Sequence, residues 1–280
     1  MAETLTDKAA TVGQQIRDRL DGLGRFTHFT LATAGWTLRG TRGHGRFRLL
    51  MPQLYLIGTR SIPVVMLVGA FVGAVLGVET FDQFQAIGQE RTLGGIINLS
   101  VVKQIGPVLA AVMIAGRVGG AVSAELGTMR VTEQLDALRV MGADPIAYLV
   151  VPRVLACVLM VPILTVVSDL LGVFGGYVVT VRGYGVNPTE YWDFSSYMVT
   201  NWDLLTGVIK GVVFGLLIGL ISCYEGFHCK QGAEGVGRAA TDSFVASFMA
   251  IIISNFFIAK FLNDLYVLIW GRAGAAAFGS

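Results

Sequence analysis

The fold is decided by one polar island between two long apolar segments, Ser123-Ala-Glu-Leu-Gly-Thr-Met-Arg-Val-Thr-Glu-Gln-Leu-Asp-Ala-Leu-Arg-Val-Met-Gly-Ala-Asp-Pro145. The island combines charged side chains with leucines at helical spacing, which predicts a short amphipathic helix. A helix of this kind between two membrane spans has no lipid to lie in. We therefore expect it at the membrane surface, where it presents itself to a soluble partner.

Composition places the chain among membrane proteins. Hydrophobic residues make up 54% of its 280 residues and charged residues only 14%, against about 25% charged in soluble domains. The mean hydropathy is +0.65. The first 60 residues are polar and basic and lack the features of a secretory signal peptide. We therefore expect the N-terminus to be retained and membrane insertion to begin at an internal span.

Five segments are long enough to cross a hydrocarbon core of about 30 Å, which takes roughly 20 helical residues. They lie near residues 57–78, 96–115, 147–181, 204–224 and 243–270. The third and fifth are longer than a bilayer needs, so they should tilt, break at Pro152 or Pro162, or extend beyond the lipid. Because open strands cannot cross lipid and no alternating pattern suggests a barrel, the predicted fold class is an all-α membrane protein.

The distribution of lysine and arginine predicts the orientation. The segment before Ser61 carries nine of them, the connection 117–148 three and the connection 225–242 two, whereas the alternate connections carry one each, Arg91 and Arg182. The positive-inside rule then places the N-terminus, the polar island and the loop before the last span in the cytoplasm. With five spans, the C-terminus lies on the opposite side.

These patterns divide the chain into four regions. Residues 1–15 are predicted to be a disordered tail. Residues 16–50 intersperse apolar side chains with arginines, which is typical of an amphipathic helix in the headgroup plane; a partly disordered basic tail is the alternative. Residues 51–270 form the membrane domain, and residues 271–280, rich in alanine and glycine, a flexible C-terminal tail.

Two glycine runs within the spans repeat every four residues. This spacing places each run on one helical face, where neighbouring backbones can approach closely. The predicted packing positions are Gly69, Gly73, Gly77, Gly211, Gly215 and Gly219. Static packing and sliding during transport are both compatible with such faces.

Ionisable residues inside the spans are costly and normally face a cavity or a partner. Asp169 has two interpretations, a structural bridge to Lys210 or Lys260, or a contact with cargo. Lys103 and Gln104 precede a Gly-Pro pair, where a break in the helix would shape a polar cavity. These two residues are the better candidates for lining a polar entrance.

Several kinds of catalytic site are missing from the sequence. No Gly-x-x-x-x-Gly-Lys-Ser/Thr run is present, so the chain is not expected to bind nucleotide phosphates itself. The three histidines lack metal-ligand spacing, and the three cysteines form no CxxC pair. The sequence therefore predicts a non-catalytic protein with no metal and no cofactor.

The polar island belongs to a longer run that resembles the MlaE (YrbE) family of ABC-transporter permeases for lipids. The run starts Gly106-Pro-Val-Leu-Ala-Ala-Val-Met-Ile-Ala-Gly-Arg-Val-Gly-Gly-Ala-Val122, continues through the island and is followed by Pro152-Arg153. Further matches are Gln53-Leu54-Tyr55 with Gly58, Gly73-Ala-Val-Leu-Gly77 and the stretch 235–241. The resemblance covers roughly residues 45–270, and residues 106–145 are its most specific part.

The resemblance implies a permease in the bacterial inner membrane that moves phospholipids and serves outer-membrane lipid asymmetry, with its C-terminus in the periplasm. The implied partners are a second copy of the chain, a cytoplasmic ATPase dimer that binds the ATP and magnesium, a periplasmic MCE-domain protein and a small STAS-domain protein on the ATPase. No nucleic acid is implied. An ion-coupled secondary transporter and a membrane scaffold without an ATPase are the alternatives.

The resemblance also implies two groups of functional residues. Glu133-Gln134 begins the coupling helix that docks into the ATPase. Helical spacing supports this assignment independently, because Leu135, Leu138 and Met141 can form an apolar stripe. The full coupling set is Glu125, Arg130, Glu133, Gln134, Leu135, Asp136, Leu138, Met141 and Asp144. The lipid pocket maps onto Leu54, Tyr55, Leu76, Ile87, Lys103, Gln104 and Ile105.

One departure from the family bears on the lipid pocket. Many relatives carry Arg-Glu-Leu-Gly-Pro where this chain reads Lys103-Gln-Ile-Gly-Pro107. An amide thus replaces a carboxylate, although it can still donate a hydrogen bond to a phosphate. The head-group preference and the direction of transport both stay open at this point.

Overall fold

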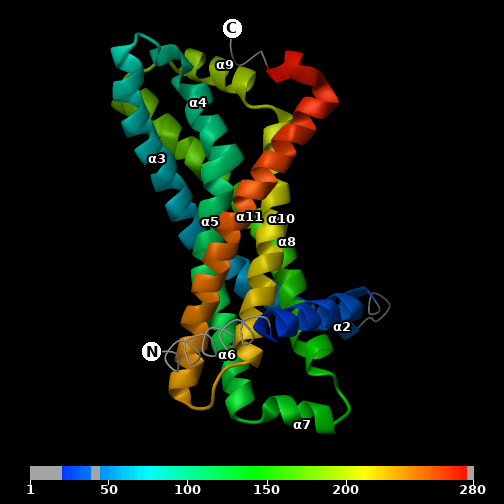
Figure 1. Cartoon of the computed structure of the whole chain (residues 1–280). Helices are drawn as coiled ribbons and strands as arrows, with labels where there is room; N and C mark the ends of the chain where they lie inside the picture. Colours follow the sequence, from blue (N-terminus) through cyan, green and yellow to red (C-terminus); the bar gives the residue numbers. More distant parts are fainter. Residues whose placement is uncertain (1–20, 39–44, 276–280) are drawn as a thin grey trace, which may run out of the picture.

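The computed structural model describes residues 21–38 and 45–275, and within these ranges helices are the regular structure and no strand occurs. The predicted all-α fold class is confirmed (Figure 1). The predicted tail 1–15 lies outside the described residues, as do residues 276–280. Residues 271–275 continue the last helix, and the flexibility expected of the tail 271–280 stays a prediction.

Five described segments are long and apolar enough to cross a membrane, which confirms the five predicted spans. Their bounds are Arg48–Ala86, Glu90–Val131, Ile146–Gly183, Asn201–Phe227 and Ala233–Ile269. The second span differs most from its prediction, which ended at residue 115. The helix continues through Arg117 into the polar island, because polar side chains do not end a helix once it has left the lipid.

The spans are built from the following elements. The first contains α2 (Gly45–Ile57), η1 (Thr59–Ser61) and α3 (Ile62–Ala86). The second contains η2 (Glu90–Thr92), α4 (Leu93–Ser100), η3 (Val101–Ile105), α5 (Gly106–Ile114), η4 (Ala115–Gly119) and α6 (Gly120–Val131). The third contains η5 (Ile146–Val150), α8 (Val151–Tyr177) and η6 (Val178–Gly183), and the last two are α10 (Asn201–Phe227) and α11 (Ala233–Ala275). The connections carry α7 (Gln134–Val140) and α9 (Pro188–Met198). Four of the short elements, η3 to η6, are π-helical.

The third span is the common support of the first and the fourth, because α3 and α10 both pack along α8. Both contacts run through the predicted glycine runs. A methyl group added at Gly73 would overlap the carbonyl oxygen of Gly172, and one added at Gly215 would meet the carbonyl oxygen of Cys157. Methyl groups added at the other four glycines would also contact the third span, at Ser168 for Gly69, Thr180 for Gly77, Pro162 for Gly211 and Val154 for Gly219. Dispersion between touching backbones here replaces the hydrophobic drive that lipid does not supply.

The third span does not break at either proline, although a break was one of the three ways in which its extra length was expected to be accommodated. Pro162 lies inside α8, which continues to Tyr177, so a break at this residue is wrong. Its backbone packs against Gly211 of α10, and a neighbouring helix of this kind supports a spanning helix at a proline. Pro152 directly follows η5, and the π-helical turn runs into α8 without interruption, so the span does not break at this residue either.

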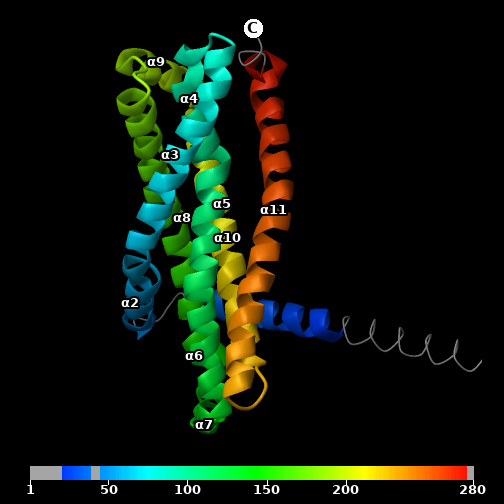
Figure 2. The ribbon, with the colours of Figure 1, turned by 90° about the vertical axis from the view of Figure 1, so that its left-hand side faces the viewer.

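The two ends of the bundle carry different elements. One end, called here the α7 end, carries residues 21–38, α7 and the turn before α11, while the other carries α9 and the end of α11 (Figures 1 and 2). Residues 21–38 lie crosswise to the spans, as expected of a helix in the headgroup plane. The N-terminal segment, the polar island and the loop before the last span, which the lysine and arginine counts place on one side of the membrane, therefore lie at the same end of the bundle.

A buried chain of hydrogen bonds fixes α9 to the second span. The Tyr191 hydroxyl donates to Asn98 Oδ1 (3.0 Å), and Asn98 Nδ2 donates to Ser195 Oγ (2.7 Å). Burial raises the pKa of Tyr191 to about 12, so its hydroxyl stays protonated and donating at neutral pH. These bonds tie α9 to α4.

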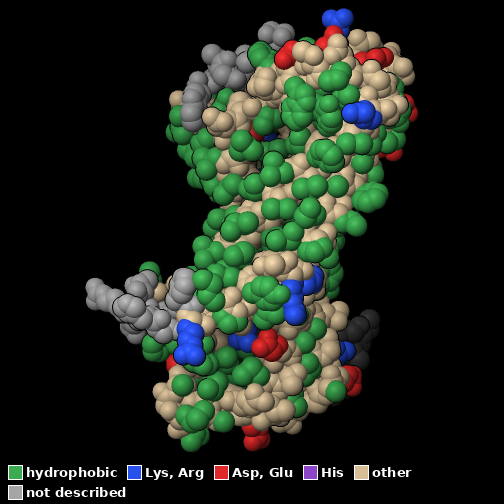
Figure 3. All heavy atoms as spheres, turned by 180° about the vertical axis from the view of Figure 1, so that it is seen from behind, with side chains coloured by type: hydrophobic (Ala, Val, Ile, Leu, Met, Phe, Trp, Pro, Cys, Tyr) green, Lys and Arg blue, Asp and Glu red, His purple; other side chains and the backbone are tan. Residues whose placement is uncertain are grey.

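Large apolar side chains are exposed along the spans. In Figure 3 hydrophobic side chains cover the middle of the molecule, whereas charged side chains gather towards its two ends. The exposed side chains of α3 and α11 include Leu67, Phe71, Phe256, Phe257 and Phe261. Exposed apolar surface of this extent is suited to lipid chains or to another apolar protein surface.

Replacing Gly73 by alanine is expected to destabilise the bundle, because the added methyl group overlaps the Gly172 carbonyl and forces α3 away from α8. Overpacking of this kind costs about 1–3 kcal/mol. Thermal denaturation of the purified protein in detergent should show a lower midpoint. Gly120→Ala is the matched control in another span, because its methyl group would lie 3.8 Å from the nearest atom, the Ala240 carbonyl oxygen. Equal midpoints for the two variants would contradict the importance of the α3–α8 contact.

Candidate functional site

The short helix predicted within the polar island is present as α7, and left-handed residues delimit it at both ends. Glu133, with φ +59°, turns the chain from α6 into α7. It is the one non-glycine residue with positive φ in the described ranges, and this conformation is unusual for a residue with a side chain. Gly142, with φ +78°, follows the helix at the other end. The helix therefore starts at the Glu133-Gln134 pair, as the sequence predicts.

The apolar face of α7 divides into an inner and an outer part. Leu135 is fully buried and Leu138 partly buried, and both pack into the main core of the bundle. Met141 is 72% exposed and its neighbour Val140 is 89% exposed. The predicted outward stripe of Leu135, Leu138 and Met141 is therefore wrong for Leu135, because this side chain holds α7 onto its own chain.

Several charged residues of the island make contacts within the chain. Asp136 accepts a hydrogen bond from Arg139 (2.7 Å) and lies 3.9 Å from Arg130. Glu133 and Gln134 are exposed, and their side chains make no hydrogen bond or ion pair with the rest of the described chain. Within the predicted coupling set, the side-chain carboxylate of Glu133 and the amide of Gln134 are thus available to bind a partner.

An ion pair connects the second and third spans just above α7. Arg153 of α8 is 3% exposed, and its Nη2 donates to Glu125 Oε1 of α6 at 2.8 Å. Its Nη1 donates to the backbone oxygen of Leu149 (2.9 Å). Without this carboxylate the buried guanidinium charge would be unpaired, which is strongly destabilising. The pair therefore fixes α6 to α8 where the chain leaves and re-enters the bundle.

The end of the island is tied to the crosswise helix. Asp144 Oδ2 accepts a hydrogen bond from Trp36 Nε1 (3.1 Å), and Asp144 Oδ1 accepts one from the backbone N–H of Ile146 (2.8 Å). Asp144, predicted to contact the ATPase, therefore links the island to residues 21–38. Leu135, the Glu125–Arg153 pair and Asp144 thus connect α7 and its flanking residues to the core, to the third span and to residues 21–38.

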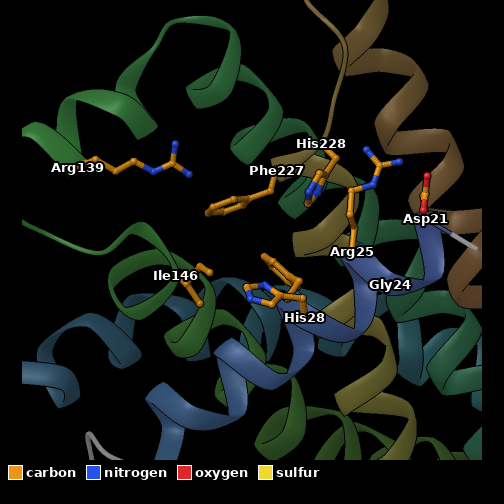
Figure 4. Close-up of a pocket in the computed structure, with 9 residues that line it drawn as sticks. Asp21, Gly24, Arg25, His28, Arg139, Ile146, Phe227 and His228 are labelled. Carbon is orange, nitrogen blue, oxygen red and sulfur yellow. The ribbon is translucent and has the colours of Figure 1, made fainter.

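A cavity of about 810 Å³ lies at the α7 end (Figure 4). Residues 21–38, α7, the start of the third span and the end of α10 all contribute to it. Its lining residues are Asp21, Gly24, Arg25, His28, Phe29, Arg139, Ile146, Phe227 and His228. The sequence did not reveal it, because its basic side chains come from segments far apart in the chain.

The predicted lipid-binding residues do not meet in one cavity of the described chain. Leu54 and Leu76 are partly buried and pack against core side chains. Tyr55 and Ile87 are exposed, and the Arg60 guanidinium lies 5.8 Å from the centre of the Tyr55 ring. A pocket that collects them would need a further surface besides this chain.

The remaining three predicted lipid-binding residues lie together in η3. This π-helical segment directly precedes Gly106-Pro107, so the irregularity predicted before the proline is present. Lys103 Nζ pairs with Asp203 Oδ1 at 3.0 Å, Gln104 accepts a hydrogen bond from Lys210, and Ile105 is partly buried. Such π-segments often occur at functional sites.

Of the two interpretations of Asp169, the bridge to Lys210 or Lys260 is wrong, because neither lysine forms an ion pair with it in the described chain. Lys210 is fully buried and donates to the backbone oxygen of Lys103 (2.9 Å) as well as to the Gln104 side chain. Lys260 is exposed on α11. Asp169 lies on the α8 face turned towards Gly106, and its Oδ1 has no hydrogen-bond partner within the described chain. Helix rotation therefore directs the lysines and the carboxyl group to different neighbours.

Sequence reasoning missed Asp203 and Thr206 of the fourth span. Asp203 forms a capping box with Thr200, whose hydroxyl and backbone N–H donate to Asp203 Oδ2 at 2.6 and 3.0 Å. The Thr-x-x-Asp pattern before an apolar run is a known signal for such a box and could have marked it. The other carboxylate oxygen of Asp203, Oδ1, pairs with the Lys103 ammonium group. No local sequence pattern predicts this contact.

The fold defines a multi-pass membrane protein, and comparison with known proteins gives its class, a permease. The family model described as Permease MlaE matches residues 50–261. A probable ABC transporter permease protein of Rickettsia felis is 39% identical over 256 residues, which cover 91% of this chain and 98% of the relative. The intermembrane phospholipid transport system permease protein MlaE of Haemophilus influenzae is 31% identical over 261 residues, 90% of this chain and 96% of the relative.

A plant protein is also similar. The chloroplastic protein TRIGALACTOSYLDIACYLGLYCEROL 1 of Arabidopsis thaliana is 37% identical over 224 residues, which cover 80% of this chain and 64% of the relative. The chain belongs to the MlaE permease family and is a permease subunit of an ABC transporter. The resemblance identified from the sequence is confirmed.

Shortening Leu135 to alanine is expected to destabilise the protein, whereas the same change at Met141 should not. Leu135 is buried in the core, and removing such a side chain costs about 2–5 kcal/mol. Met141 is exposed, where substitutions usually change stability by less than about 0.5 kcal/mol. Denaturation midpoints in detergent check this difference. A comparable loss in both variants would show that Leu135 does not anchor α7.

Proposed function

We propose that this permease moves phospholipids between the inner membrane and an MCE-type periplasmic partner, driven by ATP hydrolysis in a separate subunit. Phospholipid transport is named for the Haemophilus influenzae relative, to which the chain is similar over 90% of its length. The chain itself has no catalytic role in this proposal, and ATP and magnesium bind to the partner ATPase. Further proposed partners are a second copy of the chain and a small STAS-domain protein on the ATPase.

The observation that carries the proposal is the shape of α7. A short helix protrudes beyond the ends of the spans and exposes Val140 and Met141, together with the polar Glu133-Gln134 pair (Figures 1 and 2). Exposed apolar side chains beside polar groups suit docking of a helix into a groove of a soluble partner. The ATPase dimer is the partner that an ABC transporter permease requires.

The bracing of α7 explains how such a partner would move the spans. Leu135 fixes the helix to the core, Glu125–Arg153 fixes α6 to α8, and Asp144 fixes the island to residues 21–38. A push on α7 is therefore transmitted to the second and third spans as a rigid-body displacement rather than absorbed by a loose loop. The cavity at the α7 end is lined in part by Arg139 of α7, so it lies at the end of the bundle where this partner would dock (Figure 4).

The second copy would complete the lipid pocket. Tyr55 and Ile87 are exposed apolar side chains, and large apolar faces of α3 and α11 have no cover in the single chain. Two copies that meet through such faces would bring Leu54, Tyr55, Leu76 and Ile87 closer to η3. In this arrangement the pocket is incomplete without the partner.

Replacing both exposed apolar residues of α7 by aspartate, Val140→Asp with Met141→Asp, is expected to release the ATPase. Burying two carboxylates in an apolar groove is unfavourable, while the exposed positions leave the fold intact. The amount of ATPase that copurifies with the tagged permease should fall at least about tenfold, since a desolvated charge costs more than 1.4 kcal/mol. Tyr197→Asp, an equally exposed position on α9, is the control. Full retention of the ATPase by the double variant would contradict docking on α7.

Labelling of single cysteines tests the proposed orientation, with the N-terminus in the cytoplasm and the C-terminus in the periplasm. Tyr197→Cys on α9 should react with a membrane-impermeant maleimide added to intact spheroplasts. Met141→Cys should react only after permeabilisation. Both changes belong in a Cys229→Ser background, because Cys229 is partly exposed. The reverse labelling pattern would overturn the orientation.

A further inference from the structure

Asp169 is a buried carboxyl group of the third span that the proposed function does not use. The residue is 7% exposed, and its Oδ1 has no hydrogen-bond partner within the described chain. It lies 14 residues before Gly183, the end of the span, which is about 21 Å along the helix. An ionised carboxylate at this depth is strongly unfavourable without a cation beside it.

Backbone oxygens of η3 lie on both sides of this carboxyl group. Asp169 Oδ1 would overlap a methyl group added at Gly106, and the Val101 backbone oxygen would lie 2.9 Å from the same methyl group. A methyl group added at Gly207 would lie 2.9 Å from the Val102 backbone oxygen and 3.8 Å from Asp169 Oδ2. The carboxyl group is therefore placed among hydrogen-bond acceptors.

Pro107 explains why η3 presents a free acceptor at this place. A π-helical bond joins a carbonyl oxygen to the N–H five residues later, and the Val101 oxygen accepts such a bond from Gly106. The next bond in the series would join the Val102 oxygen to residue 107. Pro107 has no N–H, so this bond cannot form. The π-helical segment thus needs a donor on the face that Asp169 approaches.

No charged side chain of the described elements around Asp169 pairs with it. The elements η3, α5 and α10 meet at the carboxyl group, and their charged residues are Lys103, Asp203, Lys210 and Glu225. Lys103 is paired with Asp203 at 3.0 Å, and Glu225 lies near the other end of α10. The helix α3 packs against the neighbouring Ser168 through Gly69, and its charged residues, Glu79 and Asp82, are ten or more positions further along.

The ammonium group of Lys210 is directed away from the carboxyl group. This lysine lies on α10 one turn after the glycine that Asp169 approaches, but it donates to the Lys103 backbone oxygen (2.9 Å) and to the Gln104 side chain. Together with Gln104 and Thr206 it lines a cavity of about 90 Å³, which Asp169 does not border. An ionised Asp169 would therefore have no ion pair.

Close packing also limits what could neutralise the carboxyl group. The gap next to it, between Gly69, Val101, Gly106 and Ser168, is too small for a water molecule. A sodium ion with its oxygen ligands needs more room than this gap offers. A proton needs no room of its own, and it converts a carboxylate, which only accepts hydrogen bonds, into a group that donates one.

We propose that Asp169 is a proton-binding site of the permease. The carboxyl group is protonated while the second span and α10 pack against α8, and its O–H group donates to a backbone oxygen of η3. Asp169 from α8 and Lys210 from α10 then hold the same irregular segment through its carbonyl oxygens. This site goes beyond the proposed function and does not depend on it, because neither a lipid nor an ATPase enters the argument.

Infrared spectroscopy of the purified full-length permease in detergent tests the protonation state. The difference spectrum of wild type minus Asp169→Asn at neutral pH should contain the C=O stretching band of a protonated carboxyl group, shifted in heavy water, and no carboxylate band. Asparagine keeps the shape of the side chain and can donate to the same oxygen. The matched control is Asp193→Asn, an exposed position on α9, whose difference spectrum should contain carboxylate bands.

The stability of the protein should depend on pH through the same group. The folded chain holds a proton that the unfolded chain, with an exposed and ionised aspartate, does not hold, so a rise in pH favours unfolding. Between about pH 6 and about pH 9, the ratio of folded to unfolded wild type should fall by up to about tenfold per pH unit relative to Asp169→Asn. Denaturant titrations of both proteins at each pH measure this ratio, and Asp193→Asn should behave as wild type.

Three outcomes would overturn the proposal. These are a carboxylate band in the Asp169→Asn difference spectrum, parallel pH dependences of wild type and Asp169→Asn, or a wild-type stability that requires sodium instead of potassium and loses this requirement in Asp169→Asn. If Asp169→Asn does not fold, wild type labelled with heavy carbon in its aspartate carboxyl groups carries the test, because absence of a shifted C=O band of a protonated carboxyl group would equally overturn the proposal. Copurification of the ATPase is measured separately, so failure of the proposed function leaves this site untouched.

Discussion

Direct backbone contact between α8 and its two neighbours is the constraint on which the rest of the structure depends. Lipid supplies little drive for helices to associate, so their distance is set by how closely they can pack. Glycines in α3 and α10 let both helices touch α8, and Gly207 continues this contact to the backbone oxygen of Val102 in η3. A fixed distance between α10 and the second span is what allows Lys210 to reach η3 at all.

The same packing explains why charges in the spans are tolerated. Lys210 is buried where α10 lies against the π-helical segment η3, and its donors reach a backbone oxygen and an amide there. Lys103 is neutralised by Asp203 of the capping box that starts α10. The irregular backbone before Pro107 therefore lines a polar cavity, which is the setting in which non-helical geometry survives at membrane depth.

Rigid helices connect the two candidate sites. The 27 residues of α10 span about 40 Å, from the end where Asp203 pairs with Lys103 of η3 to Phe227 in the cavity at the α7 end. The second span likewise contains η3 and, at its α7 end, Glu125 with its bond to Arg153. Displacement of α7 by a docked partner would thus be transmitted along these helices to η3 and to Lys210, which bonds to it.

The sequence by itself determined the five spans, the all-α class, the two glycine runs and the start of α7 at Glu133-Gln134, because hydropathy, four-residue spacing and a family motif are local signals. It did not determine which way side chains turn. Leu135 proved to be buried, Pro162 did not break α8, and Asp169 bonded to neither lysine, since each outcome depends on which neighbouring helix faces the residue. Only the tertiary structure decided that Lys210, Thr206 and Asp203 lie near η3, because contacts between residues about 100 positions apart are fixed by helix rotation and close packing, which no sequence period encodes.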